Sequence, residues 1–216
     1  MNIPHHDVKS GYLKHCQICN SKKLKTIINL GKQPLADSLL KKKIPKKKVK
    51  RFPLGLSRCL DCGLTQLNYV VSGEVVYHKK YPYRPGITKN LKDYQNQLSS
   101  NLIKQYLLNK KSLVIDIGSN DGTLLSGFKK KCKILGIEPT NTAKIARTNG
   151  INTIQDFTNE KLAKKIVNKY GKADLITATN VFAHMADLGK VLRSIEILLN
   201  DNGHFVLENH YLLDII

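Results

Sequence analysis

The second half of the chain alternates short apolar runs with amphipathic segments. In the amphipathic segments apolar residues recur every three or four positions, which predicts helices at 124–130, 141–149, 159–170 and 188–199. The apolar runs between them predict five strands, at 113–117, 134–137, 152–154, 175–178 and 204–207. Regular alternation of strand and helix is typical of a parallel sheet covered by helices. This half is therefore predicted to have an α/β fold.

The first half is patterned less regularly. A short strand is predicted to start at Ile27 and to lead into a turn near Asp37, and residues 64–71 alternate as a second strand would. An amphipathic helix is then predicted to lead the chain to Leu113. The residues predicted to share its apolar face are Ile87, Leu91, Tyr94, Leu98, Ile103 and Tyr106.

A glycine turn follows the first strand of the α/β half. The sequence LVIDIGSNDGT, at 113–123, places Gly118 after the strand and Gly122 where the next helix begins. Gly118 lets the backbone reverse without a Cβ clash, and the strand carries Asp116 to the carboxyl edge of the sheet. Backbone amides at the start of the helix then face a ligand bound at this edge. The segment predicts a nucleotide-binding turn, and a turn without a ligand is the alternative.

The spacing of the turn indicates which cofactor it suits. It differs from the G-x-G-x-x-G of dinucleotide folds, and Asp121 inside the loop would repel a diphosphate. A carboxylate suits the amino group and sulfonium of S-adenosylmethionine. Glu138, at the end of the second strand, is placed to accept hydrogen bonds from both ribose hydroxyls. These features predict the core of an S-adenosylmethionine-dependent methyltransferase.

Residues after the later strands extend this predicted cofactor site. Asp156 and Phe157 follow the third strand, where the acid could bind the adenine amino group and the ring could stack. A surface acid beside a core phenylalanine is the alternative. The predicted cofactor-binding residues are Asp116, Gly118, Ser119, Asn120, Asp121, Gly122, Glu138, Pro139, Asp156, Phe157 and Asn180.

Four of the five cysteines form two C-x-x-C pairs, Cys16 with Cys19 and Cys59 with Cys62. Two such pairs predict a tetrahedral zinc ion held by four thiolates. Because all four positions are sulfur, no water ligand is available and the site is predicted to be structural. The long separation of the pairs requires an inserted loop, for which the lysine-rich segment 41–51 is the candidate. A redox pair and unrelated thiols are the alternatives.

One histidine, His15, lies beside the first pair, and Cys132 is the fifth cysteine of the chain. His15 could replace one cysteine as a ligand, although a solvated histidine is the simpler interpretation. Cys132 begins the second strand and is predicted to be a small buried residue. The chain is thereby divided into a zinc-binding module at 1–75, a tyrosine loop and connecting helix at 76–110, and an α/β domain at 111–216.

The chain is strongly basic, with 36 lysines and arginines against 16 acids and a net charge of +20. The run KKKIPKKKVKR at 41–51 has the charge density of a nucleic-acid-binding patch. No aromatic residue interrupts the run to stack on bases, and lysine is enriched throughout the chain. We therefore do not expect a nucleic-acid partner, but a basic surface would attract a phosphorylated small substrate.

Apolar stretches along the chain are short. None reaches the ~18 residues that a membrane-spanning helix needs, and the first residues lack the apolar core of a signal peptide. We expect a soluble, cytoplasmic protein without a membrane partner.

Eight segments together carry a resemblance to a known family. They are CQIC (16–19), INLGKQPLADSLL (28–40), CLDCGLTQL (59–67), YPYRPG (81–86), IDIGSNDGTLL (115–125), GIEPT (136–140), NVFAH (180–184) and ENHYLLD (208–214). In this order the segments resemble the zinc-containing sugar C-methyltransferases, which use S-adenosylmethionine and act on nucleotide-linked deoxysugars. The resemblance extends from about Cys16 to the last residue.

The resemblance implies a class I methyltransferase, with a Rossmann-like parallel sheet preceded by a small zinc-binding module. It implies S-adenosylmethionine over Gly118 and Glu138, and a nucleotide-linked keto sugar methylated at the carbon beside the ketone. His184, at the end of the fourth strand, is the candidate to contact the sugar or hold the enolate oxygen. A capping or core histidine is the alternative. Tyr81 and Tyr83 match the tyrosine loop over the sugar, and both remain candidates.

Members of this family continue for roughly the same length again after the segment that matches ENHYLLD. We therefore expect either a separate polypeptide that supplies the other half, or cofactor binding without complete methyl transfer. Two other functions are considered, a zinc-ribbon RNA methyltransferase and a non-catalytic basic zinc-binding module. Against the RNA enzyme, NVFAH stands after the fourth strand in place of a base-gripping N/D-P-P-Y tetrapeptide.

Overall fold

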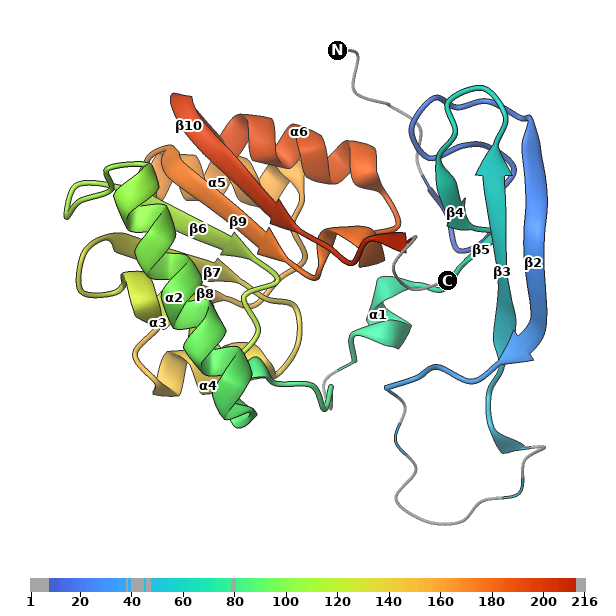
Figure 1. Cartoon of the computed structure of the whole chain (residues 1–216), viewed down its shortest axis with the longest axis horizontal. Helices are drawn as coiled ribbons and strands as arrows, with labels where there is room; N and C mark the ends of the chain where they lie inside the picture. The colour runs from blue at the N-terminus through green and yellow to red at the C-terminus, as the bar shows by residue number, and fades with distance from the viewer. Residues whose placement is uncertain (1–7, 38, 40–44, 46–47, 79–80, 213–216) are drawn as a thin grey trace. The chain divides into compact units, whose positions relative to one another are not determined.

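The computed structural model describes residues 8–37, 39, 45, 48–78 and 81–212. The chain divides into two compact units. The smaller contains residues up to Pro82 together with Ala186–Lys190, and the larger contains Tyr83–Met185 and Val191–Ile216. Figure 1 shows the larger unit as a sheet between helices and the smaller unit as antiparallel strands.

The larger unit is built on a five-stranded parallel sheet in the order β10-β9-β6-β7-β8. The strands are β6 (Leu113–Ile117), β7 (Lys133–Ile137), β8 (Thr153–Ile154), β9 (Ala173–Thr179) and β10 (Leu199–Glu208). All five predicted strands are confirmed, and β10 starts earlier than expected. The strand order reverses between β6 and β9, which is where parallel α/β sheets open a crevice for ligands at their carboxyl edge.

Five helices accompany this sheet and cover both of its faces (Figure 1). They are α2 (Lys89–Gln105), α3 (Thr123–Phe128), α4 (Thr142–Thr148), α5 (Glu160–Tyr170) and α6 (Leu188–Leu198). Alternate residues of β6 point to opposite faces. Leu113 and Ile115 pack with residues of α5 and α6, whereas Val114 packs with residues of α2 and α3. The parallel α/β fold is therefore confirmed, with one hydrophobic core on each side of the sheet.

The predicted apolar face of the connecting helix is wrong in part. Ile87 lies before α2, in the 3-10 turn η2 (Pro85–Ile87), and is 65% exposed. Tyr94 is 46% exposed, and the residues of α2 that are buried are Gln95, Ser99 and Leu102. The helix packs closely because Ser99 lies against Gly127 of α3, where a Cβ would approach the serine hydroxyl to 1.9 Å. Small and polar side chains therefore form a contact that hydrophobic periodicity does not indicate.

The smaller unit contains antiparallel strands. β2 (Leu24–Gln33), β3 (Phe52–Cys59) and β4 (Thr65–Leu67) form one sheet in that order, and β1 (Gly11–Tyr12) pairs with β5 (Tyr69–Val70). One short helix follows, α1 (Gly73–Val76).

Two predictions for the smaller unit are corrected by these strands. The strand predicted at Ile27 is confirmed as part of β2. The run 64–71 is two strands in different sheets, which meet at Asn68. The backbone N–H of Asn68 donates to the carbonyl oxygen of Gly55, and its own carbonyl oxygen accepts from the N–H of Leu13. Strand β3 was not predicted, since it begins directly after the lysine-rich run. Much of that run, 41–51, lies outside the described residues.

None of the helices in the described part of the chain combines the length and the apolarity that crossing a bilayer requires.

The core of the larger unit can be tested with one matched pair of leucines. Leu125 of α3 is fully buried, whereas Leu107 is 83% exposed. Leu125→Ala should lower the free energy of unfolding by about 2–5 kcal/mol, since it removes buried methyl groups and leaves a cavity. Leu107→Ala should change it by less than about 0.5 kcal/mol. Native-state hydrogen exchange of the β6 amides measures both effects, and equal values for the two variants would contradict this description of the core.

Candidate functional site

The turn after β6 brings the backbone of two glycines closer to neighbouring side chains than a Cβ would permit. Gly118 has φ +72°, and a Cβ on it would lie 2.5 Å from Cγ2 of Val181, which follows β9. Gly122 has φ +80°, and a Cβ there would lie 2.9 Å from Cγ1 of Ile151. Both conformations are left-handed and favour glycine. The two glycines predicted at this turn are therefore required by both backbone conformation and space.

Glu138 fixes the turn from the neighbouring strand. It follows β7 and is 5% exposed. Its Oε2 accepts a hydrogen bond from the backbone N–H of Asn120 at 2.9 Å, and its Oε1 accepts one from the N–H of Thr140 at 2.8 Å. Each carboxylate oxygen can accept a further bond. Glu138 can thus organise the turn and still accept hydrogen bonds from a pair of ribose hydroxyls.

Two polar atoms of the turn are buried without a hydrogen-bond partner among the residues that the structure describes. They are Oγ of Ser119 and Oδ1 of Asn120. Asn120 also has φ +50°, a left-handed conformation that is uncommon for residues with a Cβ. Buried polar atoms normally have hydrogen-bond partners, and unpartnered ones indicate a missing ligand or water. These atoms fit a polar cofactor such as S-adenosylmethionine at the turn.

Asp116 lies beneath the turn rather than at an open edge. It is 3% exposed, and its Oδ1 accepts a hydrogen bond from Oγ1 of Thr177 at 2.7 Å. Its pKa is raised to about 7. Burial is the main cause and the negative charge of Glu138 adds to it, whereas the hydrogen bond from Thr177 lowers the pKa. The alternation of β6 places Asp116 on the same face as Val114, toward α2 and α3. Asp116 is therefore a buried acid below the proposed cofactor site.

Asp121 makes its contacts to the protein. The side chain is 6% exposed, and its Oδ1 accepts a hydrogen bond from Oγ1 of Thr123 at 2.6 Å. Its Oδ2 accepts one from the backbone N–H of Gly86 at 3.1 Å. The carboxylate predicted to face the positive end of the cofactor is thus already bound by donors of the chain.

The remaining predicted cofactor residues lie after β7 and β8. Pro139 follows Glu138 and is half-buried. Asp156 is exposed, and its Oδ1 accepts a hydrogen bond from the N–H of Phe157 at 2.8 Å. The ring of Phe157 is 39% exposed, so one part of it is available for stacking on a flat ligand.

Asn180 and Glu208 join the ends of β9 and β10. Asn180 has φ +53°, and its backbone N–H donates to the carbonyl oxygen of Glu208 at 2.7 Å. Its Nδ2 donates to Oε1 of Glu208 at 2.8 Å, and the hydroxyl of Tyr94 donates to Oε2. The bond to Glu208, more than burial, raises the pKa of Tyr94. No local sequence pattern indicates the bond between Tyr94 and Glu208, because the two residues lie far apart in the chain.

The predicted catalytic residues lie in two short segments, 81–86 and 182–184. His184 ends the 3-10 turn η3 (Phe182–His184) after β9 and is exposed. Tyr83 is 50% exposed, and its carbonyl oxygen accepts a hydrogen bond from Nδ2 of Asn120 at 3.1 Å. Burial, followed by the charge of Asp121, raises the pKa of the Tyr83 phenol. The ring of Tyr81 lies 5.5 Å from that of Tyr77, centroid to centroid. The structure thus ties Tyr83, through its backbone, to the proposed cofactor turn.

Four cysteine thiols gather in the smaller unit. The sulfurs of Cys16, Cys19, Cys59 and Cys62 all lie within 4.8 Å of one another. Sγ of Cys16 is 3.5 Å from that of Cys62, and Sγ of Cys19 is 3.5 Å from that of Cys59. Four sulfurs around a tetrahedral zinc ion would be about 3.8 Å apart, given a zinc–sulfur bond of about 2.3 Å. The donor set and its spacing therefore fit zinc, and all four predicted ligands come together.

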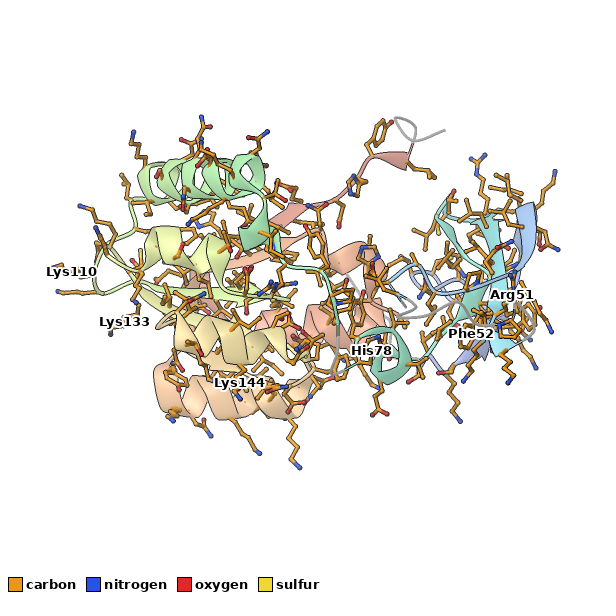
Figure 2. The ribbon with its side chains drawn as sticks, turned by 90° about the horizontal axis from the view of Figure 1, so that it is seen from below. Arg51, Phe52, His78, Lys110, Lys133 and Lys144 are labelled. Carbon is orange, nitrogen blue, oxygen red and sulfur yellow. The ribbon has the colours of Figure 1, made fainter. Side chains whose placement is uncertain are left out.

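Basic side chains of the larger unit extend away from its sheet (Figure 2). Lys133 begins β7 and Lys110 precedes β6, so both lie at the amino edge, opposite the turn with Gly118. Lys144 is an exposed residue of α4. Two of these three charges, those of Lys110 and Lys133, therefore lie away from the carboxyl edge of the sheet.

Comparison with known families gives two matches. Residues 91–214 match the family described as "Methyltransferase domain", which is more than half of the chain. Residues 16–77 match the family described as "Putative zinc binding domain".

Comparison with individual proteins gives one curated relative, the C-methyltransferase NovU from Streptomyces niveus. It is 26% identical over 206 residues, which are 94% of this chain and 49% of NovU. The chain therefore spans about half the length of this relative.

Among solved structures, DesVI from Streptomyces venezuelae superposes with a TM-score of 0.47 at 18% identity, covering 68% of this chain and 61% of DesVI. YcgJ from Bacillus subtilis superposes with a TM-score of 0.44 at 20% identity, covering 55% of this chain and 51% of YcgJ. Neither similarity indicates a substrate.

The zinc site predicts the result of one substitution. Cys59→Ser should lose the bound zinc, because the four-thiolate set is broken, and should destabilise the smaller unit. Metal analysis of the purified protein measures the effect. Cys132→Ser is the matched control, since Cys132 is buried in the core of the larger unit and should leave the zinc content unchanged. A full equivalent of zinc in the Cys59 variant would contradict the ligand assignment.

The buried acid predicts a pH dependence of stability. The pKa of Asp116 rises from 3.8 to about 7 on folding. Between about pH 4 and pH 7 the folded chain keeps a proton that the unfolded chain has released, so the free energy of unfolding should fall as pH rises. Asp116→Asn should remove this fall, measured by urea unfolding across that range. The exposed Asp201→Asn should retain the dependence of the unaltered chain.

Proposed function

This chain belongs to the family of proteins with a methyltransferase domain, and we propose that it methylates a nucleotide-linked keto-deoxysugar at the carbon beside the ketone. Its larger unit has the class I S-adenosylmethionine-dependent fold, and its four-cysteine module binds zinc. S-adenosylmethionine supplies an electrophilic methyl group when bound. The transfer to carbon and the choice of a sugar are the parts of the function that we propose.

One observation carries the cofactor part of this proposal. Glu138 accepts hydrogen bonds from the backbone N–H groups of Asn120 and Thr140. In the same turn, Oγ of Ser119 and Oδ1 of Asn120 are buried without a hydrogen-bond partner among the described residues. Glu138 would bind the ribose of S-adenosylmethionine, and Ser119 and Asn120 would satisfy their unpartnered atoms on its polar groups. The preformed backbone makes this edge ready to bind a nucleoside.

Two observations support transfer to the carbon of a sugar. NovU is named a C-methyltransferase, and it aligns with 94% of this chain. The segments YPYRPG and NVFAH match those of sugar C-methyltransferases, and they carry the candidate residues Tyr83 and His184. A nucleotide-linked sugar also carries phosphates, which a chain with net charge +20 attracts.

The chemistry assigns roles to the candidate side chains. Removal of the proton beside a ketone leaves an enolate, whose oxygen must be held by hydrogen-bond donors. His184 can donate from its imidazole at the end of β9, and Tyr83 can donate from its protonated phenol. Tyr81 is the alternative tyrosine for this role. The chain spans 49% of NovU, so the roles assigned here cover only the part of the reaction that its own residues can serve.

The proposal can be tested by following a labelled methyl group. The chain is incubated with methyl-labelled S-adenosylmethionine and a nucleotide-linked 4-keto-deoxyhexose, alone and with the remaining half of NovU added as a separate polypeptide. Label on a sugar carbon supports the proposal, and His184→Asn should lower the rate without changing the affinity for the cofactor. Label in RNA, offered in parallel, with none in the sugar would replace the proposal by an RNA methyltransferase.

The role of Glu138 predicts a loss of cofactor affinity. Glu138→Ala should weaken binding of S-adenosylmethionine by about 1.5–3 kcal/mol, because hydrogen bonds to an ionised carboxylate are lost. Glu138→Gln, which keeps the size of the side chain, should lose a smaller part. Isothermal titration measures the affinity of the unaltered chain and of both Glu138 variants for S-adenosylmethionine. Glu196→Ala, on the exposed side of α6, is the control. Unchanged affinity in both Glu138 variants would show that the ribose binds elsewhere.

A further inference from the structure

The segment that carries Tyr83 is hydrogen-bonded to the proposed cofactor turn at two points. Nδ2 of Asn120 donates to the carbonyl oxygen of Tyr83 at 3.1 Å. The backbone N–H of Gly86 donates to Oδ2 of Asp121 at 3.1 Å. Asn120 and Asp121 are consecutive residues of the turn, so two neighbouring side chains hold one short segment. These two bonds therefore tie the segment Tyr83–Gly86 to the turn.

The residues around Asp121 hold its carboxylate in the contact with Gly86. Its carboxylate also accepts hydrogen bonds from Oγ1 of Thr123 at 2.6 Å and from the N–H of Thr123 at 3.3 Å. A carboxylate that is 6% exposed must be paired by donors, since burial of an unpaired charge is costly. Oδ1 faces the start of α3 and Oδ2 faces Gly86, so the side chain bridges the two segments.

Gly86 is required for this bridge because there is no space for a side chain. A Cβ at residue 86 would lie 2.7 Å from Oγ1 of Thr123 and 2.8 Å from Oδ2 of Asp121. Only a glycine lets the N–H approach the carboxylate while the same carboxylate holds Thr123. The exact fit explains a glycine at this position, which a loop would not otherwise need.

Asn120 extends the bridge to the ribose-binding residue. Its N–H donates to Oε2 of Glu138, and its side chain donates to Tyr83. Any ligand that orders Glu138 and the turn therefore also orders the backbone of Tyr83. Coupling of this kind is reciprocal, so a substrate that holds Tyr83 would strengthen cofactor binding by the same factor.

We propose that Asp121 is a positioning residue that latches the Tyr83–Gly86 segment to the cofactor turn, so that cofactor binding places the Tyr83 phenol for the sugar substrate. This inference rests on the proposed function, because that function supplies the substrate that Tyr83 would face. It also selects Tyr83 over Tyr81 as the tyrosine of the site. A protonated phenol donates a hydrogen bond, which suits the ketone oxygen of the substrate as it gains negative charge.

The test uses the full chain and S-adenosylhomocysteine, the cofactor without its transferable methyl group. Tyr83 is replaced by 3-fluorotyrosine, and the fluorine signal is followed during a titration while calorimetry measures binding. Hydrogen exchange of the residue 86 amide is measured on the same samples. In the otherwise unaltered chain, S-adenosylhomocysteine should shift the fluorine signal and slow the exchange of this amide.

Two latch variants and one control define the outcome. Gly86→Ala and Asp121→Asn should bind S-adenosylhomocysteine but should lose most of the ligand-induced fluorine shift. In both, the residue 86 amide should exchange about tenfold faster, as expected for loss of a hydrogen bond to a charged group. Asp93→Asn, an exposed acid of α2, should behave as the unaltered chain does. Exchange of the β6 amides shows that each variant is folded.

Four results would each overturn the proposal in whole or in part. A full fluorine response in both variants would show that the contact does not place Tyr83. Loss of ligand binding in Asp121→Asn, with a normal response in Gly86→Ala, would make Asp121 a direct cofactor ligand. Binding by the unaltered chain without any response at Tyr83 would overturn the coupling alone. Failure of the unaltered chain to bind S-adenosylhomocysteine would overturn the proposed function as well.

Discussion

The larger unit depends on one constraint at the carboxyl edge of its sheet. Side chains approach the backbone of glycines there more closely than a Cβ would permit. Because Gly118 has no Cβ, the side chain of Val181 can pack against it. The same holds for Gly136 and Ser119, whose Oγ would lie 2.3 Å from a Cβ at residue 136. The amides of Gly118 and Ser119 donate to the carbonyl oxygen of Ile137, which ties the turn to β7. Glu138 then holds the turn by accepting from Asn120. The proposed nucleoside site would then use the carboxylate of Glu138 and the side-chain oxygens of Ser119 and Asn120.

The smaller unit is stabilised by a different kind of interaction. Cys16 and Cys59 are the buried apolar side chains of its described residues, and β2 is exposed along almost its entire length. An antiparallel sheet without a hydrophobic core is not expected to be stable alone. Zinc on four thiolates replaces the missing core, because the binding free energy of the metal becomes folding free energy. The two units therefore use separate sources of stability, one metal-based and one hydrophobic.

The short segment from Tyr83 to Gly86 links the proposed catalytic tyrosine to the proposed cofactor turn. In most glycine turns an acid in the loop would be assigned to the ligand, and the sequence favours that interpretation of Asp121. The structure shows the acid bound to Gly86 and Thr123. An enzyme that removes a proton beside a ketone must place donors before the enolate forms. A latch between cofactor turn and substrate-facing tyrosine would provide that order of events.

The sequence alone determined the alternating fold, the four zinc ligands and the glycine turn, because these depend on local periodicity and spacing. It also placed Glu138 at the end of its strand. It missed strand β3, which follows a lysine-rich run, and it assigned Tyr94 to an apolar face. Only the tertiary structure decided the bonds of Tyr94 with Glu208 and of Gly86 with Asp121. The physical reason is that each bond joins groups distant in the chain, so no local pattern records which donor meets which carboxylate.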